Sequence, residues 1–172
     1  PTAAEVALWS RYPDAPFVAV SRAQAHLLAG LNVVATVHHG VDVETSPFRG
    51  VPGDYLLFLG RFTEGKGVLA AIEVARRTGL LLVLAAAEND YYRDVVAPLV
   101  DGRHVVYAGE VARPDLAALI GGARALVYPP QAGEPFGLVL VEAMACGKPV
   151  AALDRGAVSE IVEPGTTGGV FD

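Results

Sequence analysis

The sequence predicts an α/β fold with a mostly parallel sheet. Apolar runs of strand length alternate with helical patterns along most of the 172 residues, and this alternation is typical of repeated βα units. The runs at Tyr55 to Gly60 and Leu80 to Ala86 are apolar along almost their whole length, as strands covered on both faces are. Since 52% of the residues are apolar, we expect a globular chain with a sizeable core.

The first part of the chain contains one βα unit and the start of another. Phe17 to Ser21 is a candidate strand, Arg22 to Leu28 a helix, and Val33 to Val37 a short strand. Pro47 to Gly53 is rich in proline and glycine and reads as a linker. The sequence therefore predicts a boundary near residue 48.

The second part continues with alternating strands and helices. After the strand at Tyr55 to Gly60, a helix from Gly67 to Arg77 is ended by Gly79, and Pro114 suits the first turn of a later helix. The remaining expected helices are Asp90 to Val100, Pro114 to Ile120, Gly137 to Cys146 and Ser159 to Val162. The remaining expected strands are Leu80 to Ala86, His104 to Ala108, Arg124 to Tyr128, Pro149 to Leu153 and Gly169 to Phe171.

Charge and composition exclude several classes of protein. The net charge of −6 argues against binding to a nucleic-acid backbone, which requires clustered Lys and Arg. The single cysteine, Cys146, cannot form an internal disulfide and is expected to act as a small apolar side chain, which favours a reducing, cytoplasmic location. The apolar runs are too short to insert into a membrane, and the start at Pro1 shows no signal peptide. Because the sequence starts without a methionine and ends directly after the strand-like Gly169 to Phe171, we expect an excised part of a longer protein.

Three loops follow predicted strands and should meet at one edge of the sheet. They are Gly60 to Gly67, Gly109 to Arg113 and Gly133 to Gly137. In open α/β sheets, ligands bind beyond the carboxyl ends of the strands. Arg61 and Lys66 lie among glycines in the first loop and could neutralise a diphosphate.

Two glutamates eight positions apart are the most informative feature of the sequence. Glu134 precedes the predicted helix and Glu142 lies about two turns along it, among apolar neighbours where a carboxylate requires a partner. The backbone N–H groups of Phe136, Gly137 and Leu138 could receive phosphate oxygens at the helix start. This arrangement suits an anionic ligand that is rich in hydroxyl groups.

The segment from Gly133 to Val162 resembles the paired-glutamate signature of the retaining, GT-B-fold glycosyltransferases of family four. Phe58 to Gly67 resembles that family's first strand and phosphate loop, while Val18 to Ser21 and His39 to Asp42 resemble its interdomain connection. The resemblance implies a Rossmann-like, doubly wound sheet that forms the carboxy-terminal half of a two-domain enzyme. Residues 1–48 would be the tail of the amino-terminal Rossmann-like domain together with the interdomain connection, and residues 49–172 the carboxy-terminal, nucleotide-sugar-binding Rossmann-like domain.

The resemblance also implies roles for individual residues. Arg61 and Lys66 would contact the phosphates of a nucleoside diphosphate sugar, and Glu134 would contact the hydroxyls of the transferred sugar. These three residues would be the catalytic ones. Glu142 would bind the ribose hydroxyls, and the backbone at Gly109 to Val111 would meet the nucleobase. The other implied donor contacts are Gly60, Phe136, Gly137 and Leu138.

The implied reaction transfers a sugar to an acceptor hydroxyl with retention and without a metal or other cofactor. The acceptor would be bound by an amino-terminal domain that is mostly missing, so the isolated chain is expected to be inactive. A non-catalytic sugar-nucleotide-binding module is the alternative. Each of these residues also has a possible structural role that involves no ligand. Arg61 and Lys66 could form a solvated basic turn, Glu134 could compensate the charge at a helix end, and Glu142 could be a surface residue of an amphipathic helix.

Two other enzyme classes fit less well. The loop nearly matches a phosphate-binding G-x-x-x-x-G-K-[ST] pattern, but Gly67 occupies the position of the hydroxyl that would hold Mg²⁺. The glutamate pair could act as a glycosidase acid and nucleophile, although its place beside a cationic loop favours donor binding. His38 and His39 depart from the family pattern, and we expect them at a hinge or cleft wall.

Overall fold

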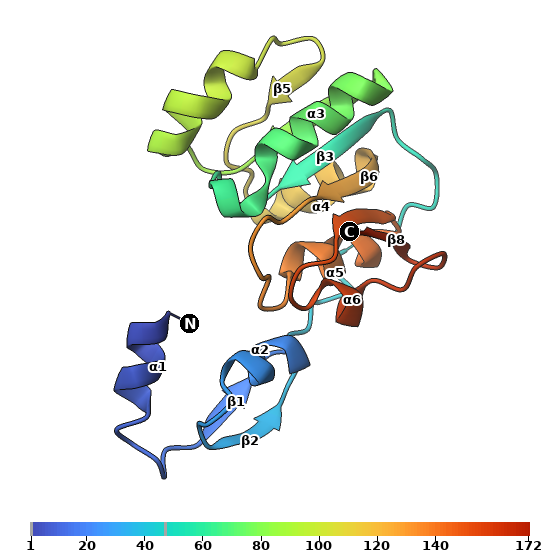
Figure 1. The fold of residues 1–172 in the computed structure, drawn as a ribbon. Helices are drawn as coiled ribbons and strands as arrows, with labels where there is room; N and C mark the ends of the chain where they lie inside the picture. Colours follow the sequence, from blue (N-terminus) through green and yellow to red (C-terminus); the bar gives the residue numbers. More distant parts are fainter. Residues whose placement is uncertain (1, 47) are drawn as a thin grey trace.

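The computed structural model describes residues 2–46 and 48–172, and it contains two parallel sheets. Pro47, the first residue of the predicted linker, lies outside the described residues. The smaller sheet pairs β1 (Phe17–Ala19) with β2 (Val33–Thr36), and α1 (Ala3–Trp9) and α2 (Arg22–Leu27) accompany it (Figure 1). Val18 and Val34 are exposed on this sheet.

The larger sheet has six parallel strands in the order β5-β4-β3-β6-β7-β8. Their bounds are β3 Tyr55–Leu59, β4 Leu81–Ala85, β5 Val105–Tyr107, β6 Ala123–Tyr128, β7 Val150–Leu153 and β8 Gly168–Phe171. From β3 the chain builds outward through β4 to β5, then crosses to β6 and builds outward in the other direction. The order thus reverses between β3 and β6, and the carboxyl ends of these strands form a topological switch point, where ligands bind in such sheets.

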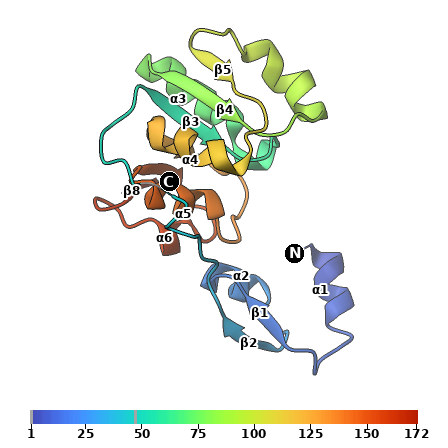
Figure 2. The ribbon, with the colours of Figure 1, turned by 180° about the vertical axis from the view of Figure 1, so that it is seen from behind.

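Helices cover both faces of the larger sheet. The longer ones are α3 (Val68–Thr78), α4 (Arg113–Gly122) and α5 (Leu138–Ala145), and a short α6 (Val158–Ile161) follows β7. In Figure 1 α3 lies in front of the sheet, whereas the reverse view in Figure 2 brings α4 to the front.

The pleat of β3 divides the core between the two faces. Leu56 and Phe58 pack with Ile72 of α3, whereas Leu57, between them in the sequence, packs with Leu140 of α5. Because successive side chains of a strand point to opposite faces, an all-apolar β3 supplies both cores. The prediction of a doubly wound parallel sheet is confirmed.

The expected strands and most expected helices are present, with ends shifted by one or two residues. The helix predicted at Asp90 to Val100 is also present, but beyond its first two residues its geometry is π-helical at η2 (Tyr92–Val96) and 3₁₀ at η3 (Ala97–Leu99). Pro98 lies in η3 and has no N–H to continue an α-helical ladder, which accounts for the change of geometry. Neither α1 nor the 3₁₀ turn η1 (Glu64–Lys66) was expected from the sequence pattern.

Shortening Ile72 to valine tests the packing of α3 on the sheet. Its side chain is 1% exposed, and the change removes one buried methyl group. We expect the free energy of unfolding to fall by about 1 kcal/mol, measured by urea denaturation. Val74→Ala on the exposed side of α3 is the matched control, and an equal loss in both variants would contradict the assigned packing.

Within the described residues, no helix combines the length and the apolarity that crossing a membrane requires.

Candidate functional site

The loops that follow β3 and β6 enclose a cavity of about 400 Å³ at the switch point, here called the first cavity. The two loops are joined by the Gln131 N–H, which donates to the Gly65 carbonyl at 2.9 Å. Residues of the β3 side that line the cavity are Leu59, Gly60, Arg61 and Lys66. Those of the β6 side are Tyr128, Glu134, Pro135, Phe136, Gly137, Leu138 and Val139.

A partly buried ion pair lies in this cavity. Lys66 Nζ donates to Glu134 Oε2 at 2.5 Å and to the Tyr128 hydroxyl at 2.8 Å. The Tyr128 hydroxyl in turn donates to Glu134 Oε2. Tyr128 is 1% exposed and Glu134 7% exposed, so the carboxylate depends on these partners rather than on water.

These contacts keep Glu134 ionised. Burial raises its pKa, but the hydrogen bonds from Lys66 and Tyr128, together with the positive charge of Lys66, outweigh burial and place the pKa below its usual value. Burial and the bond to Glu134 raise the pKa of Tyr128, so its hydroxyl keeps its proton. The site therefore holds a carboxylate and an ammonium group beside an open cavity.

The start of α5 forms another part of the wall. Gly137 precedes the helix with a φ of 89°, and its carbonyl accepts from Leu140 N–H at 2.9 Å. Phe136 and Leu138 flank it and also line the first cavity. The Leu138 and Val139 N–H groups stand at the start of the helix, where amides have no acceptor in a preceding turn, so this wall is positively polarised and suits an anion.

A second cavity of about 280 Å³ adjoins the first, and the two share Leu59, Gly60, Arg61 and Val139 in their walls. Arg61 is exposed and faces both cavities. Glu142 lines the second cavity from α5. The two predicted cations and two predicted carboxylates thus line two adjoining cavities: Lys66 and Glu134 line the first, Glu142 lines the second, and Arg61 lines both.

Loops after β4 and β5 complete the second cavity. Ala85 at the end of β4, and Ala86 and Ala87 directly after it, line this cavity. From the loop after β5, Glu110 and Val111 are among the described residues that line the cavity, and Gly109 is not. The Gly109 carbonyl instead accepts a hydrogen bond from the Ala86 N–H at 3.1 Å. Of the two donor contacts predicted in this loop, Val111 therefore reaches the cavity and Gly109 supports the loop beside it.

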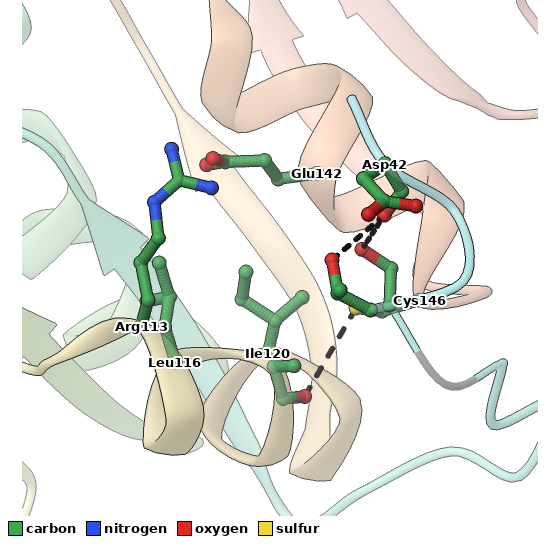
Figure 3. Close-up of a pocket in the computed structure, with 9 residues that line it drawn as sticks. Asp42, Arg113, Leu116, Ile120, Glu142 and Cys146 are labelled. Carbon is green, nitrogen blue, oxygen red and sulfur yellow. Dashed lines mark hydrogen bonds between the residues drawn. The ribbon is translucent and has the colours of Figure 1, made fainter. Parts of the chain in front are cut away.

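Glu142 also borders a third cavity of about 380 Å³ (Figure 3). Figure 3 shows the Arg113 guanidinium of α4 extending toward the Glu142 carboxylate. Burial raises the pKa of Glu142, and the charge of Arg113 offsets part of that rise. Cys146 lies at the other end of this cavity and is 1% exposed, as expected for a small apolar side chain.

Residues from the first part of the chain close one side of the first cavity. Val20, Gln24 and His39 line it. The rings of His39 and Phe136 are packed edge to face, with 5.2 Å between their centroids. His39 therefore occupies a cavity wall, one of the two positions expected for it. The neighbouring His38 lies with its Nε2 3.7 Å from Glu160 Oε2.

Sequence reasoning missed Tyr128, Gln24 and Glu160. The position of Tyr128 at the end of a predicted strand next to the phosphate-type loop was a usable signal, because strand ends meet the ligand in this fold. For Gln24 and Glu160 the sequence holds no comparable signal, since their places depend on contacts that join segments more than one hundred residues apart.

Comparison with known proteins identifies relatives of this chain. The family model described as glycosyl transferases group 1 matches residues 48–172. The glycogen synthase of Mycobacterium tuberculosis is 34% identical over 151 residues, which cover 81% of this chain and 36% of that protein. Its alpha-maltose-1-phosphate synthase is 32% identical over 161 residues, covering 80% of this chain and 41% of the relative.

Solved structures share the fold. Anabaena Alr3699/HepE in complex with UDP and glucose superposes with a TM-score of 0.82 at 23% identity, over 97% of this chain and 52% of that one. AviGT4, a glycosyltransferase involved in avilamycin A biosynthesis, gives 0.75 at 28% identity, over 90% of this chain and 50% of its own. This chain thus spans about half the length of these proteins, and less of the curated relatives.

Proposed function

The chain belongs to the group 1 glycosyl transferases, and from that premise we propose that its larger sheet binds a nucleoside diphosphate sugar and supports retaining transfer of the sugar to an acceptor hydroxyl. The observation that carries the proposal is the grouping of Arg61, Lys66 and Glu134 around one cavity at the start of α5, with Glu142 in the adjoining cavity. Cations and helix N–H groups match a diphosphate, and the two carboxylates match hydroxyl donors.

The geometry suggests how the ligand would lie. The diphosphate would occupy the hollow between Arg61, Lys66 and the N-terminus of α5, with the sugar toward Glu134 and the ribose toward Glu142. The Lys66 ammonium, held between Glu134 and Tyr128, would turn toward a phosphate oxygen, and Tyr128 would remain as the partner of the carboxylate. The nucleobase would fill the second cavity against Val111.

In the proposed reaction, the bond from the sugar to the diphosphate breaks and a bond from the sugar to the acceptor oxygen forms on the same face, while the proton of the acceptor hydroxyl passes to the leaving diphosphate. The leaving diphosphate gains negative charge as the first bond breaks. Arg61, Lys66 and the dipole of α5 would stabilise this charge. We propose that these groups supply the charge that a divalent metal supplies in other enzymes.

Calorimetric titration of the chain with UDP, GDP, dTDP and ADP sugars tests the proposal, and UDP-glucose is the first probe because a second structure of Anabaena Alr3699/HepE holds it. Binding of one nucleotide sugar with an affinity above that of the free sugar supports the proposed site. Absence of binding to all four classes would overturn it. Sugar transfer or release by a longer protein that contains this chain separates a transferase from a non-catalytic module.

Glu142→Ala tests the ribose contact. Loss of two hydrogen bonds from hydroxyls to a half-buried carboxylate should weaken nucleotide-sugar binding about tenfold. Glu163→Ala, which removes an exposed glutamate after α6, is the matched control and should leave the affinity unchanged. Equal affinities of wild type and Glu142→Ala would remove Glu142 from the proposed site.

We also propose that residues 1–48 belong to an amino-terminal domain that binds the acceptor. The longer relatives and the exposed apolar side chains of the β1–β2 unit, including Leu27, Val34 and Val37, support this assignment. The single cysteine supports a reducing compartment such as the cytoplasm.

A further inference from the structure

Glu160 connects α6 of the larger sheet to the start of α2 in the first part of the chain. Its Oε1 accepts the Ala23 N–H at 2.6 Å, and its Oε2 accepts the Arg22 N–H at 2.9 Å and Arg22 Nε at 3.3 Å. The Glu160 side chain is 12% exposed. The carboxylate thus satisfies two amide groups of the first turn of α2 that have no partner within that helix.

A second contact fixes the same helix start. The Ser21 hydroxyl donates to the Pro135 carbonyl at 2.6 Å and accepts the Gln24 N–H at 2.9 Å. Ser21 is fully buried, and Pro135 directly follows Glu134. The beginning of α2 is therefore tied on one side to α6 and on the other to the loop that carries Glu134.

These two contacts border the first cavity. Val20 and Gln24 line it, and the Gln24 side chain accepts the Val20 N–H at 2.8 Å. Any movement of the start of α2 would therefore move this wall of the cavity. Glu160 and Ser21 are not among the described residues that line the cavity. Glu160 can therefore affect the cavity through α2, whose first residues it binds.

We propose that Glu160 is a positioning residue that holds the α2 wall of the first cavity in place. The contact is a property of the folded chain alone, whereas its effect on a nucleotide sugar rests on the function proposed above. Glu160 belongs to α6 in the part of the chain with the larger sheet, and α2 belongs to the part with the smaller sheet. The contact therefore also fixes the position of one part relative to the other beside the first cavity.

A carboxylate is the side chain that this contact requires. Burial raises the pKa of Glu160, but the bonds from the Arg22 and Ala23 amides and the Arg22 side chain outweigh it and lower the pKa. The charge also complements the positive end of α2. In Glu160→Gln, one carbonyl oxygen remains and the new NH₂ group faces an N–H, so one backbone amide loses its acceptor.

Glu160→Gln in the 172-residue chain tests the proposal through NMR. We expect the Ala23 or Arg22 amide to exchange with solvent about tenfold faster, because the helix start opens. We also expect the resonances of the Gln24 side-chain amide and the Gly137 amide to shift, since both residues line the first cavity. Glu163→Gln is the matched control and should change neither measurement.

Binding of UDP-glucose gives the second measurement. If the wild-type chain binds it, Glu160→Gln should weaken binding about fivefold, since loss of one hydrogen bond displaces a wall without removing a ligand contact. Unchanged exchange at Arg22 and Ala23, or unchanged Gln24 and Gly137 resonances, would overturn the positioning role. If wild type itself does not bind, the proposed function fails, and the ligand-free NMR comparison still decides the role of Glu160.

Discussion

Replacing Lys66 with methionine should lower the free energy of unfolding by about 3 kcal/mol and weaken nucleotide-sugar binding by at least about tenfold. The substitution keeps the length of the side chain but leaves the Glu134 carboxylate, 7% exposed, with the Tyr128 hydroxyl as its remaining side-chain partner. Breaking a buried pair from one side is costly because an uncompensated charge stays buried. Lys66 keeps partial access to solvent and Tyr128 stays, so we expect the lower part of the usual range.

The control for Lys66→Met is Arg77→Met. Arg77 pairs with Glu73 at 2.7 Å on the surface of α3, and the two side chains are 78% and 52% exposed. Loss of such a pair costs about 0.3–0.5 kcal/mol because water already screens the charges. Urea denaturation of both variants at neutral pH gives the comparison. Equal losses would show that the Lys66–Glu134 pair is no more important than a surface pair.

The same pair gives the prediction a definite dependence on pH. The pKa of Glu134 is lower in the folded state than its ordinary value of 4.5, so the pair stabilises the fold above that value and this contribution is lost as the pH falls through the folded pKa. In Lys66→Met the main opposing charge is gone and burial raises the pKa of Glu134. The difference in stability between wild type and Lys66→Met should therefore shrink between neutral pH and about pH 4. A difference that grows on acidification would contradict the ion pair.

Gly156→Ala should destabilise the chain by about 3 kcal/mol or more. Gly156 has a φ of 67°, and a Cβ atom there would lie 2.3 Å from the Glu134 carbonyl oxygen and 2.5 Å from the Glu134 nitrogen. This close approach allows the Ala157 N–H to donate to the Glu134 carbonyl at 2.8 Å. A side chain at residue 156 would therefore strain its own backbone and push Glu134 away from Lys66.

Gly165→Ala separates the two effects. Gly165 has a φ of 81°, but a Cβ atom there would meet nothing within 4 Å. We expect a cost of about 1 kcal/mol, which comes from the backbone conformation alone. Thermal unfolding of both variants and titration with UDP-glucose provide the test, and only Gly156→Ala should also lose affinity. If both variants lose the same stability, Gly156 does not position Glu134 by close approach.

The arrangement of the larger sheet could be predicted from the sequence because its signals are local. An apolar run such as Tyr55 to Leu59 identifies a strand covered on both faces, and the glycines and cations that follow it identify a loop at the strand end. Since all six strands are parallel, their following loops lie at one edge. This explains why the sequence alone was enough to expect Arg61, Lys66 and Glu134 near one another, with Glu142 on the helix that follows Glu134.

The residues that could not be predicted depend on contacts between distant segments. The end of a predicted strand marked Tyr128 as a residue near the ligand edge, but its hydrogen bonds with Lys66 and Glu134 join segments that are distant in the sequence. Glu160 reads as a helix residue, and its role depends on α2, which comes much earlier in the chain. The departure from α-helical geometry within Asp90 to Val100 is different in kind, because Pro98 was visible in the sequence and lacks the N–H that an α-helical ladder requires.

The position of β3 at the centre of the larger sheet has a consequence for folding kinetics. Its neighbour β6 pairs Ala123 with Tyr55, so β4, β5 and their connecting helices are synthesised between the two central partners. The chain must close this long loop before the central pair can form, which makes the search slow and leaves an unpaired strand edge exposed in the meantime. We therefore expect intermediates that contain β3, β4 and β5 without β6 to be prone to aggregation during refolding.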